Sequence, residues 1–322
     1  MNKFDNNEIF LEASKAKRKF KPIIVVLFFI LVFDIGAAIQ NIVCIPSMGK
    51  WSVELLPQME AILSDPNASI SDLLALIGNI PPYVMIPLLF GTIGTTILSI
   101  IYVTKIEKRS LASMGFFKQK FLTNYPLGYL IGAFIMVISA LGCLLFKGIS
   151  IKAGGFNLLI ILFFLGYIVQ GMSEEVLCRG FFMISLRNSM KNKYATLIAV
   201  LISSLAFALL HSINPGLTLV ALLNLFLSGV FFALLTLRFD NLWVPCAAHA
   251  AWNFFQGHVL GSQVSGMDSN YSFLVSEQTG HWFFHGGSFG FEGSLMIMFI
   301  LIVGIALLFV FPKKSNHEIS DS

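Results

Sequence analysis

The sequence predicts an all-α membrane protein, a bundle of about eight transmembrane helices. Of its 322 residues, 56% are hydrophobic and only 12% are charged, whereas a soluble globular protein has about 25% charged residues. The apolar residues gather in runs of about 20, which is the length that crosses a bilayer as a helix. These observations exclude an ordinary soluble domain. The formal net charge of +4 is too small to indicate nucleic acid as a partner.

Eight apolar runs are candidates for the membrane-spanning helices of a domain at residues 22–311. They lie roughly at residues 22–44, 81–104, 125–146, 156–187, 194–213, 217–237, 242–257 and 292–311. The seventh run is short, and the fourth is unusually long for a single crossing. The stretch 258–291 is rich in Gly, Ser, Asn and aromatic residues, so we expect it to be a loop outside the membrane.

The positions of Lys and Arg predict how the chain crosses the membrane. They cluster before the first run and then in alternate loops: near Lys105–Lys120, near Arg187–Lys193, at Arg238 and at Lys313–Lys314. Basic residues stay on the cytoplasmic side of a membrane. We therefore expect both termini in the cytoplasm, as tails at 1–21 and 312–322. The acidic segment from Glu54 to Asp72 then faces outward.

Three charged residues lie inside the fourth apolar run: Glu174, Glu175 and Arg179. An ionisable residue within the membrane costs roughly 2.5–3.5 kcal/mol on insertion scales, so each one requires an explanation. Glu175 and Arg179 are four residues apart and share one helix face, which predicts a structural ion pair. Glu174 is rotated by about 100° from Glu175 and needs a different partner.

Polar residues of the fifth and seventh runs can supply that partner. If the fourth and fifth runs form an antiparallel hairpin about Lys191–Lys193, Glu174 and His211 lie at similar depth. Glu174 can then act as a general base on a water molecule that His211 holds. His249 and Asn253 share a helix face and can donate hydrogen bonds to an oxyanion. Alternatively, Glu174, His211 and His249 can bind zinc, so the cofactor is either none or zinc.

These residues form three motifs in order on separate runs: E-E-x-x-x-R (Glu174, Glu175, Arg179), F-x-x-x-H (Phe207, His211) and H-x-x-x-N (His249, Asn253). Further matches are Arg179-Gly180-Phe181, Asn224 with Gly229, and Leu242-Trp243-Val244-Pro245. Over residues 125–257 the sequence resembles the CAAX prenyl protease and bacteriocin-processing family of intramembrane endopeptidases, also called CPBP or Abi proteins.

The resemblance implies a role for each motif residue. It implies that Glu174 and His211 activate the attacking water, and that the Glu175–Arg179 pair gives structural support. By the same resemblance, His249 and Asn253 stabilise the oxyanion. The family is commonly labelled metalloprotease, but a metal-free glutamate mechanism is also proposed for it, so the resemblance leaves metal dependence open.

The resemblance also indicates where the protein works and on what. The Gly-rich segment at 286–293 resembles a tail of bacterial family members, which implies a bacterial cell membrane. The implied partners are secreted peptides, bacteriocin precursors or other membrane-associated proteins. The main alternative is a non-catalytic scaffold that confers bacteriocin immunity or regulates a partner membrane protein. A transporter is disfavoured, because the sequence lacks two matching halves with broken helices.

Overall fold

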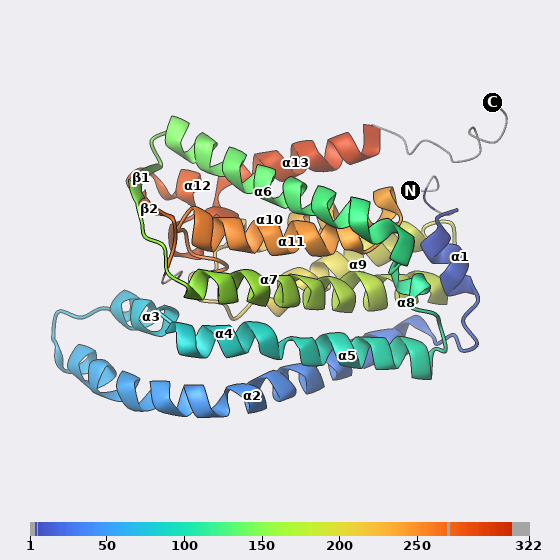
Figure 1. Cartoon of the computed structure of the whole chain (residues 1–322), viewed down its shortest axis with the longest axis horizontal. Helices are drawn as coiled ribbons and strands as arrows, with labels where there is room; N and C mark the ends of the chain where they lie inside the picture. Colours follow the sequence, from blue (N-terminus) through green and yellow to red (C-terminus); the bar gives the residue numbers. More distant parts are fainter. Residues whose placement is uncertain (1–3, 5, 269–270, 311–322) are drawn as a thin grey trace.

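Helices run side by side along the long axis of the molecule (Figure 1). The structure is a computed structural model that describes residues 4, 6–268 and 271–310. All eight apolar runs are helical, which confirms the predicted all-α fold class. The main helices are α2 (Pro22–Ser64), α4 (Pro82–Gly91), α5 (Ile93–Ile101), α6 (Phe121–Leu145), α7 (Leu159–Glu175), α9 (Ala195–Leu210), α10 (Leu219–Phe239), α11 (Trp243–Phe254) and α13 (Leu295–Val310). The shorter helices are α1 (Glu8–Ser14), α3 (Ile70–Gly78), α8 (Ile184–Ser189) and α12 (Trp282–His285).

Three segments of π-helix extend helices of the bundle, at Tyr102–Ile106, Val176–Met183 and Phe255–Val259. With these extensions, five helical stretches are long and apolar enough to cross a membrane: Pro22–Ser64, Pro82–Ile106, Lys118–Leu145, Leu159–Ser189 and Leu219–Phe239. Helices α9 and α13 are apolar but shorter. Large apolar side chains such as Leu122, Phe134 and Phe299 are exposed on the outside of the bundle, as lipid contact requires. The number of crossings stays a prediction.

The loop between α5 and α6, the loop between α8 and α9 and the last turn of α10 carry three of the predicted basic clusters, and they meet at one end of the bundle, beside α1 (Figure 1). The Asp240 carboxylate, in the turn after α10, accepts hydrogen bonds from the backbone N–H groups of Glu8 and Ile9 at 2.9 and 3.2 Å. Asn188, at the end of α8, donates to the carbonyl oxygen of Ala13 at 2.8 Å. These three basic clusters therefore lie together, as their spacing predicts, whereas Lys313–Lys314 lies outside the described residues.

Part of the segment that we expected to be an N-terminal tail is ordered against the bundle. Helix α1 buries Ile9 and Phe10, so residues 8–14 belong to the packed body. The predicted C-terminal tail at 312–322 lies outside the described residues. Which end of the bundle faces the cytoplasm stays a prediction.

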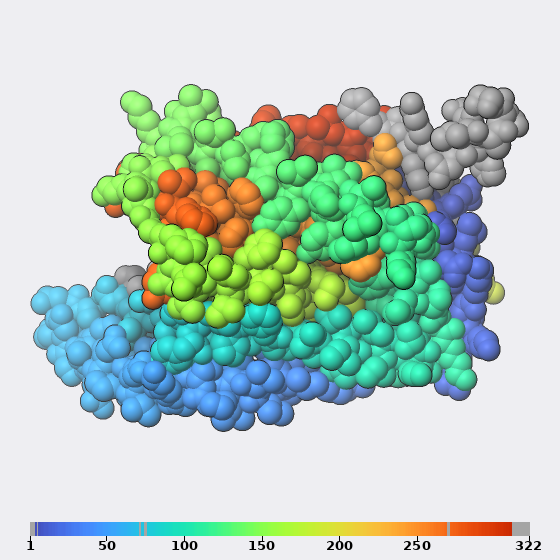
Figure 2. Space-filling view, in the orientation of Figure 1, coloured from blue at the N-terminus to red at the C-terminus, as the bar shows by residue number. Residues whose placement is uncertain are grey.

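Helix α2 is longer than the apolar run that predicted it, because it continues from residue 44 to Ser64. Its 43 residues span roughly 65 Å at 1.5 Å per residue, about twice the apolar thickness of a bilayer. Pro46 and Pro57 lie inside this helix; each removes one backbone donor, and neither ends the helix. The extension carries Glu54 and Glu60 of the acidic segment and projects beyond its neighbours in Figure 2.

At the end opposite to α1, two short strands close the bundle (Figure 1). Strands β1 (Ile149–Ala153) and β2 (Leu274–Gln278) pair antiparallel, with Ile149 opposite Gln278 and Ala153 opposite Leu274. The sequence did not predict this pair, because five-residue strands so far apart in the chain are brought together only by the helices. The predicted loop at 258–291 contains β2 and α12.

Helix α11 lies in the core between α6 and α7, and all its residues from Val244 to Asn253 are buried. The glycines of the facing helices allow backbones to approach closely. A Cβ atom on Gly132 of α6 would lie 2.0 Å from the Ala248 carbonyl oxygen, and one on Gly171 of α7 would lie 2.8 Å from the Ala250 nitrogen. These contacts set the position of His249 on α11.

We expect Gly132→Ala to destabilise the fold by about 1–3 kcal/mol, because the added methyl group overpacks the contact between α6 and α11. The matched control is Gly49→Ala in α2, where a Cβ atom would meet nothing within 4 Å. There the same change should stabilise the helix by roughly 0.5–1 kcal/mol. Thermal unfolding in detergent measures both changes. Equal unfolding temperatures for the two variants would contradict close packing at Gly132.

Candidate active site

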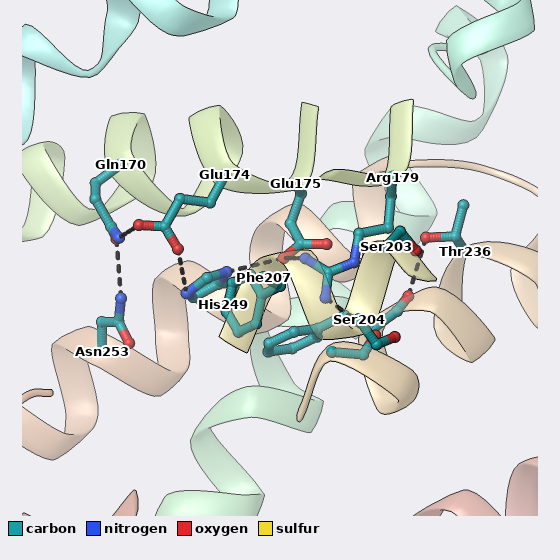
Figure 3. Close-up of polar contacts among 12 residues, drawn as sticks. Gln170, Glu174, Glu175, Arg179, Ser203, Ser204, Phe207, Thr236, His249 and Asn253 are labelled. Atoms are coloured by element: carbon teal, nitrogen blue, oxygen red, sulfur yellow. Dashed lines mark hydrogen bonds and ion pairs between the residues drawn. The ribbon is translucent and has the colours of Figure 1, made fainter. Parts of the chain in front are cut away.

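Three side chains, from α7, from α11 and from the residue that follows α9, converge at the middle of the bundle. Glu174 lies at the midpoint of the Leu159–Ser189 stretch, and His211 follows the last residue of α9. The Nε2 atom of His211 lies 4.0 Å from Glu174 Oε2, which confirms that the two residues share one depth. The Nε2 atom of His249 lies 3.6 Å from the same oxygen. Figure 3 shows the histidine of α11 facing Glu174.

The structural ion pair is present and fully buried. Arg179 Nη1 donates to Glu175 Oε1 at 2.8 Å, and both side chains are 0% exposed. Arg179 Nη2 also donates to the carbonyl oxygen of Gly229 on α10 at 3.0 Å. The same Glu175 oxygen lies 2.9 Å from His249 Nδ1, a contact that the sequence did not predict. The pair therefore orients the histidine as well as the helix.

One turn before Glu174, Gln170 joins two of the predicted site residues. Its Nε2 donates to Glu174 Oε1 at 2.6 Å, and its Oε1 accepts from Asn253 Nδ2 at 2.9 Å (Figure 3). Asn253 therefore reaches Glu174 through Gln170. Our sequence analysis missed Gln170, although its place four residues before Glu174 puts it on the same helix face.

The hydrogen bonds of the two histidines determine which ring nitrogen carries the proton. His211 Nδ1 lies 2.9 Å from the Phe207 carbonyl oxygen, and His249 Nδ1 lies 2.9 Å from the Glu175 carboxylate. Both partners can only accept, so Nδ1 carries hydrogen in both rings. In the neutral rings, each Nε2 is an acceptor that faces Glu174. The Oε2 atom of Glu174 is buried and has no hydrogen-bond partner.

The segment that contains most of this cluster matches a known protein family. Residues 156–255 match the family model of the Rce1-like type II CAAX prenyl endopeptidases. This segment contains Glu174, His211, His249 and Asn253, and the match confirms the resemblance predicted from the motifs. No curated protein and no solved structure matches the chain. An Rce1-like segment supports a function of the intramembrane protease type.

Two supporting residues of the Rce1-like segment have clear structural roles. Asn224 Nδ2 donates to the carbonyl oxygens of Glu292 and Ser294 at 2.7 and 2.8 Å, so it holds the chain that enters α13. A Cβ atom on Gly229 would lie 2.8 Å from the Ser204 Cα atom. The glycine therefore allows α9 and α10 to approach, which places His211 beside α7.

The Glu174, His211 and His249 side chains face a cavity of about 270 Å³. Its polar lining includes Gln170, Glu174, His211, His249, Asn253, Ser265 and Glu292. Apolar side chains from α2 and α4, such as Phe33 and Met85, form part of the wall. The cavity therefore combines a largely apolar wall with two carboxylates and two imidazoles.

Glu292 is a second cavity residue that our sequence analysis missed. It lies in the Gly-rich segment before α13, at the first residue of the eighth predicted run, and no spacing in the sequence relates it to the three motifs. Only the folded chain brings this carboxylate to the site.

As the side chains are placed, Glu174 Oε2 lies farther from each histidine Nε2 than two ligand atoms of one zinc ion lie from each other. Among the described residues, no group of three or more His, Cys, Asp and Glu side chains is arranged to hold a metal. Tetrahedral zinc brings its ligand atoms to about 3.3 Å from one another, whereas the Glu174 and histidine atoms lie 3.6 and 4.0 Å apart. Metal dependence stays a prediction, to be tested with a chelator.

Proposed function

We propose that the protein is an intramembrane endopeptidase that hydrolyses a peptide bond of a membrane-associated protein or peptide. One observation carries the proposal: the buried Oε2 of Glu174 has no hydrogen-bond partner, and two imidazole Nε2 atoms face it at 3.6 and 4.0 Å. These separations are too long for direct hydrogen bonds and suit a bridging water molecule.

Water activation follows from the acceptors that surround this position. A water molecule there donates one hydrogen to Glu174 Oε2 and the other to a histidine Nε2. As the water oxygen attacks the carbonyl carbon of the substrate, Glu174 takes its proton as general base. Gln170 donates to Oε1 of Glu174 and so keeps Oε2 directed toward the water. Gln170 is therefore a positioning residue.

The attack forms a tetrahedral oxyanion, which needs hydrogen-bond donors. His249 Nδ1 already donates to Glu175, so its Nε2 donates to the oxyanion only when the ring carries both protons. Glu175 then balances the charge of the ring. The amide nitrogen of Asn253 has two hydrogens; one is used on Gln170, and the second is free for the oxyanion.

Collapse of this intermediate completes the reaction. Glu174 returns its proton to the leaving nitrogen, the C–N bond breaks, and the products are a free amine and a carboxylic acid that keeps the second hydrogen of the water. We derive no step through a metal ion. We further propose a bacterial cell membrane as the location, with the basic end of the bundle in the cytoplasm and secreted peptides or bacteriocin precursors as substrates.

The full chain in liposomes tests this proposal. We expect it to cleave members of a fluorogenic library of membrane peptides and prenylated peptides, with the cleaved bond identified by mass spectrometry. Cleavage should persist with a strong chelator, because the reacting groups belong to the protein. Loss of cleavage with chelator and its recovery with zinc would contradict the metal-free mechanism. The absence of cleavage throughout the library would favour the scaffold.

A further inference from the structure

The wall of the cavity carries a carboxylate that the proposed reaction does not use. Glu292 is only 7% exposed and lines the same cavity as Glu174. Its Oε2 accepts hydrogen bonds from the backbone N–H and the hydroxyl of Ser265 at 2.7 and 2.8 Å. Its Oε1 accepts from Trp252 Nε1 at 3.2 Å. The carboxylate is therefore held rigidly by three donors.

The turn that holds Glu292 is itself constrained. Ser265 has a φ angle of 49°, in the left-handed region that residues with a side chain rarely adopt. Both of its donors nevertheless point at the Glu292 carboxylate. Strain of this kind persists where surrounding contacts impose it, and it is commonest at ligand-binding sites. The position of the carboxylate is thus specified by the fold.

The charge of Glu292 has no permanent cation beside it. Its three hydrogen-bond donors are neutral groups, and among the described residues that line the cavity there is no Lys or Arg. A carboxylate has about four acceptor positions, so one remains after these three bonds. A buried carboxylate with a free acceptor position binds cations well, because burial strengthens electrostatic attraction.

We propose that Glu292 forms an acidic subsite that binds a Lys or Arg side chain of the substrate close to the cleaved bond. The proposal rests on the proposed protease function and narrows its substrate class. The favoured substrate is therefore a peptide segment with a basic residue close to the cleaved bond.

A binding assay tests the subsite without requiring cleavage. The protein is the full chain with Glu174→Gln in nanodiscs, so that bound peptide stays intact and the Glu174 charge is absent. The probes are two membrane peptides that differ only in having Lys or its uncharged isostere norleucine at one position. A set of such pairs places the Lys at different positions. For one of these pairs, we expect the Lys peptide to bind about tenfold or more tightly than the norleucine peptide.

Adding Glu292→Gln to the Glu174→Gln protein should remove the preference for the Lys peptide. The affinity for the norleucine peptide should stay the same. The matched control is Glu277→Gln on strand β2, an exposed carboxylate that pairs with Lys152 at 2.6 Å; it should retain the preference. Equal affinities for every pair before Glu292 is changed, or a preference that survives its change, would overturn the subsite. If Glu292→Gln weakens both peptides alike, Glu292 only supports the Ser265 turn and the proposal also fails.

The assay keeps failure of the subsite distinct from failure of the proposed function. A wild-type protein that prefers Lys peptides in binding but cleaves none of them would overturn the protease function and leave the subsite standing. A wild-type protein that cleaves Lys and norleucine peptides at equal rates would leave the protease standing and overturn the subsite.

Discussion

Glu174→Gln is expected to lower the rate of peptide cleavage by roughly 10²–10⁴-fold, the range that a general base contributes. Glutamine has nearly the same shape but cannot take a proton from water. The two histidines would still face the side chain, since His211 and His249 are held by bonds to Phe207 and Glu175. The loss should therefore appear in kcat more than in KM, as initial rates on a fluorogenic peptide in liposomes would show.

The matched control for this variant is Asp34→Asn. Asp34 is also a carboxylate within an apolar helix, but it lies on α2 with an exposed side chain, and it does not line the cavity. Its replacement should leave the cleavage rate unchanged. If Glu174→Gln cleaves as fast as wild type, the proposed mechanism is wrong. In cells, an unchanged immunity or processing phenotype at normal protein level would favour the scaffold.

Arg179→Leu is expected to destabilise the fold by about 3–5 kcal/mol, the cost of leaving one partner of a buried ion pair uncompensated. The Glu175 carboxylate would then be fully buried with only His249 beside it. Arg179 also donates to the carbonyl oxygen of Gly229, so its replacement leaves this buried oxygen without that hydrogen bond. The expected result is a lower unfolding temperature in detergent and less protein in the membrane.

The double variant Glu175→Gln with Arg179→Leu tests the cause of that loss. Replacing both charges removes the uncompensated carboxylate, and such replacements are often neutral for stability. The side-chain oxygen of the introduced glutamine can still accept the hydrogen bond from His249. We expect most of the lost stability to return. A double variant as unstable as Arg179→Leu alone would show that the bonds of Arg179, and not the unpaired charge, dominate.

Helical periodicity made the bundle and part of its site predictable. The Glu175–Arg179 pair follows from a spacing of four residues on one helix. The pairing of Glu174 with His211 follows from the hairpin between the fourth and fifth runs, because residues equally far from a turn lie at equal depth. Both relations involve residues on one helix or on two successive helices. The relative positions of such residues can be derived from their spacing in the sequence.

The continuation of α2 beyond residue 44 shows a limit of the apolar pattern. That pattern marks the part of a helix that contacts lipid. The first predicted run therefore ended at residue 44, near the point where polar residues begin. The helix itself continues to Ser64, because its backbone hydrogen bonds form within the helix whether lipid or water surrounds it. Hydropathy therefore predicted the membrane-facing part and not the full element.

The sequence by itself determined the fold class, the family motifs and the central carboxylate, because each depends on residues close together in the chain. Only the tertiary structure decided that His249 faces both Glu174 and Glu175 and that Glu292 reaches the cavity. Glu292 lies more than 80 residues after His211, and no periodicity relates them. Such contacts depend on how closely helices approach, which small residues such as Gly132 and Ala248 set at their interfaces.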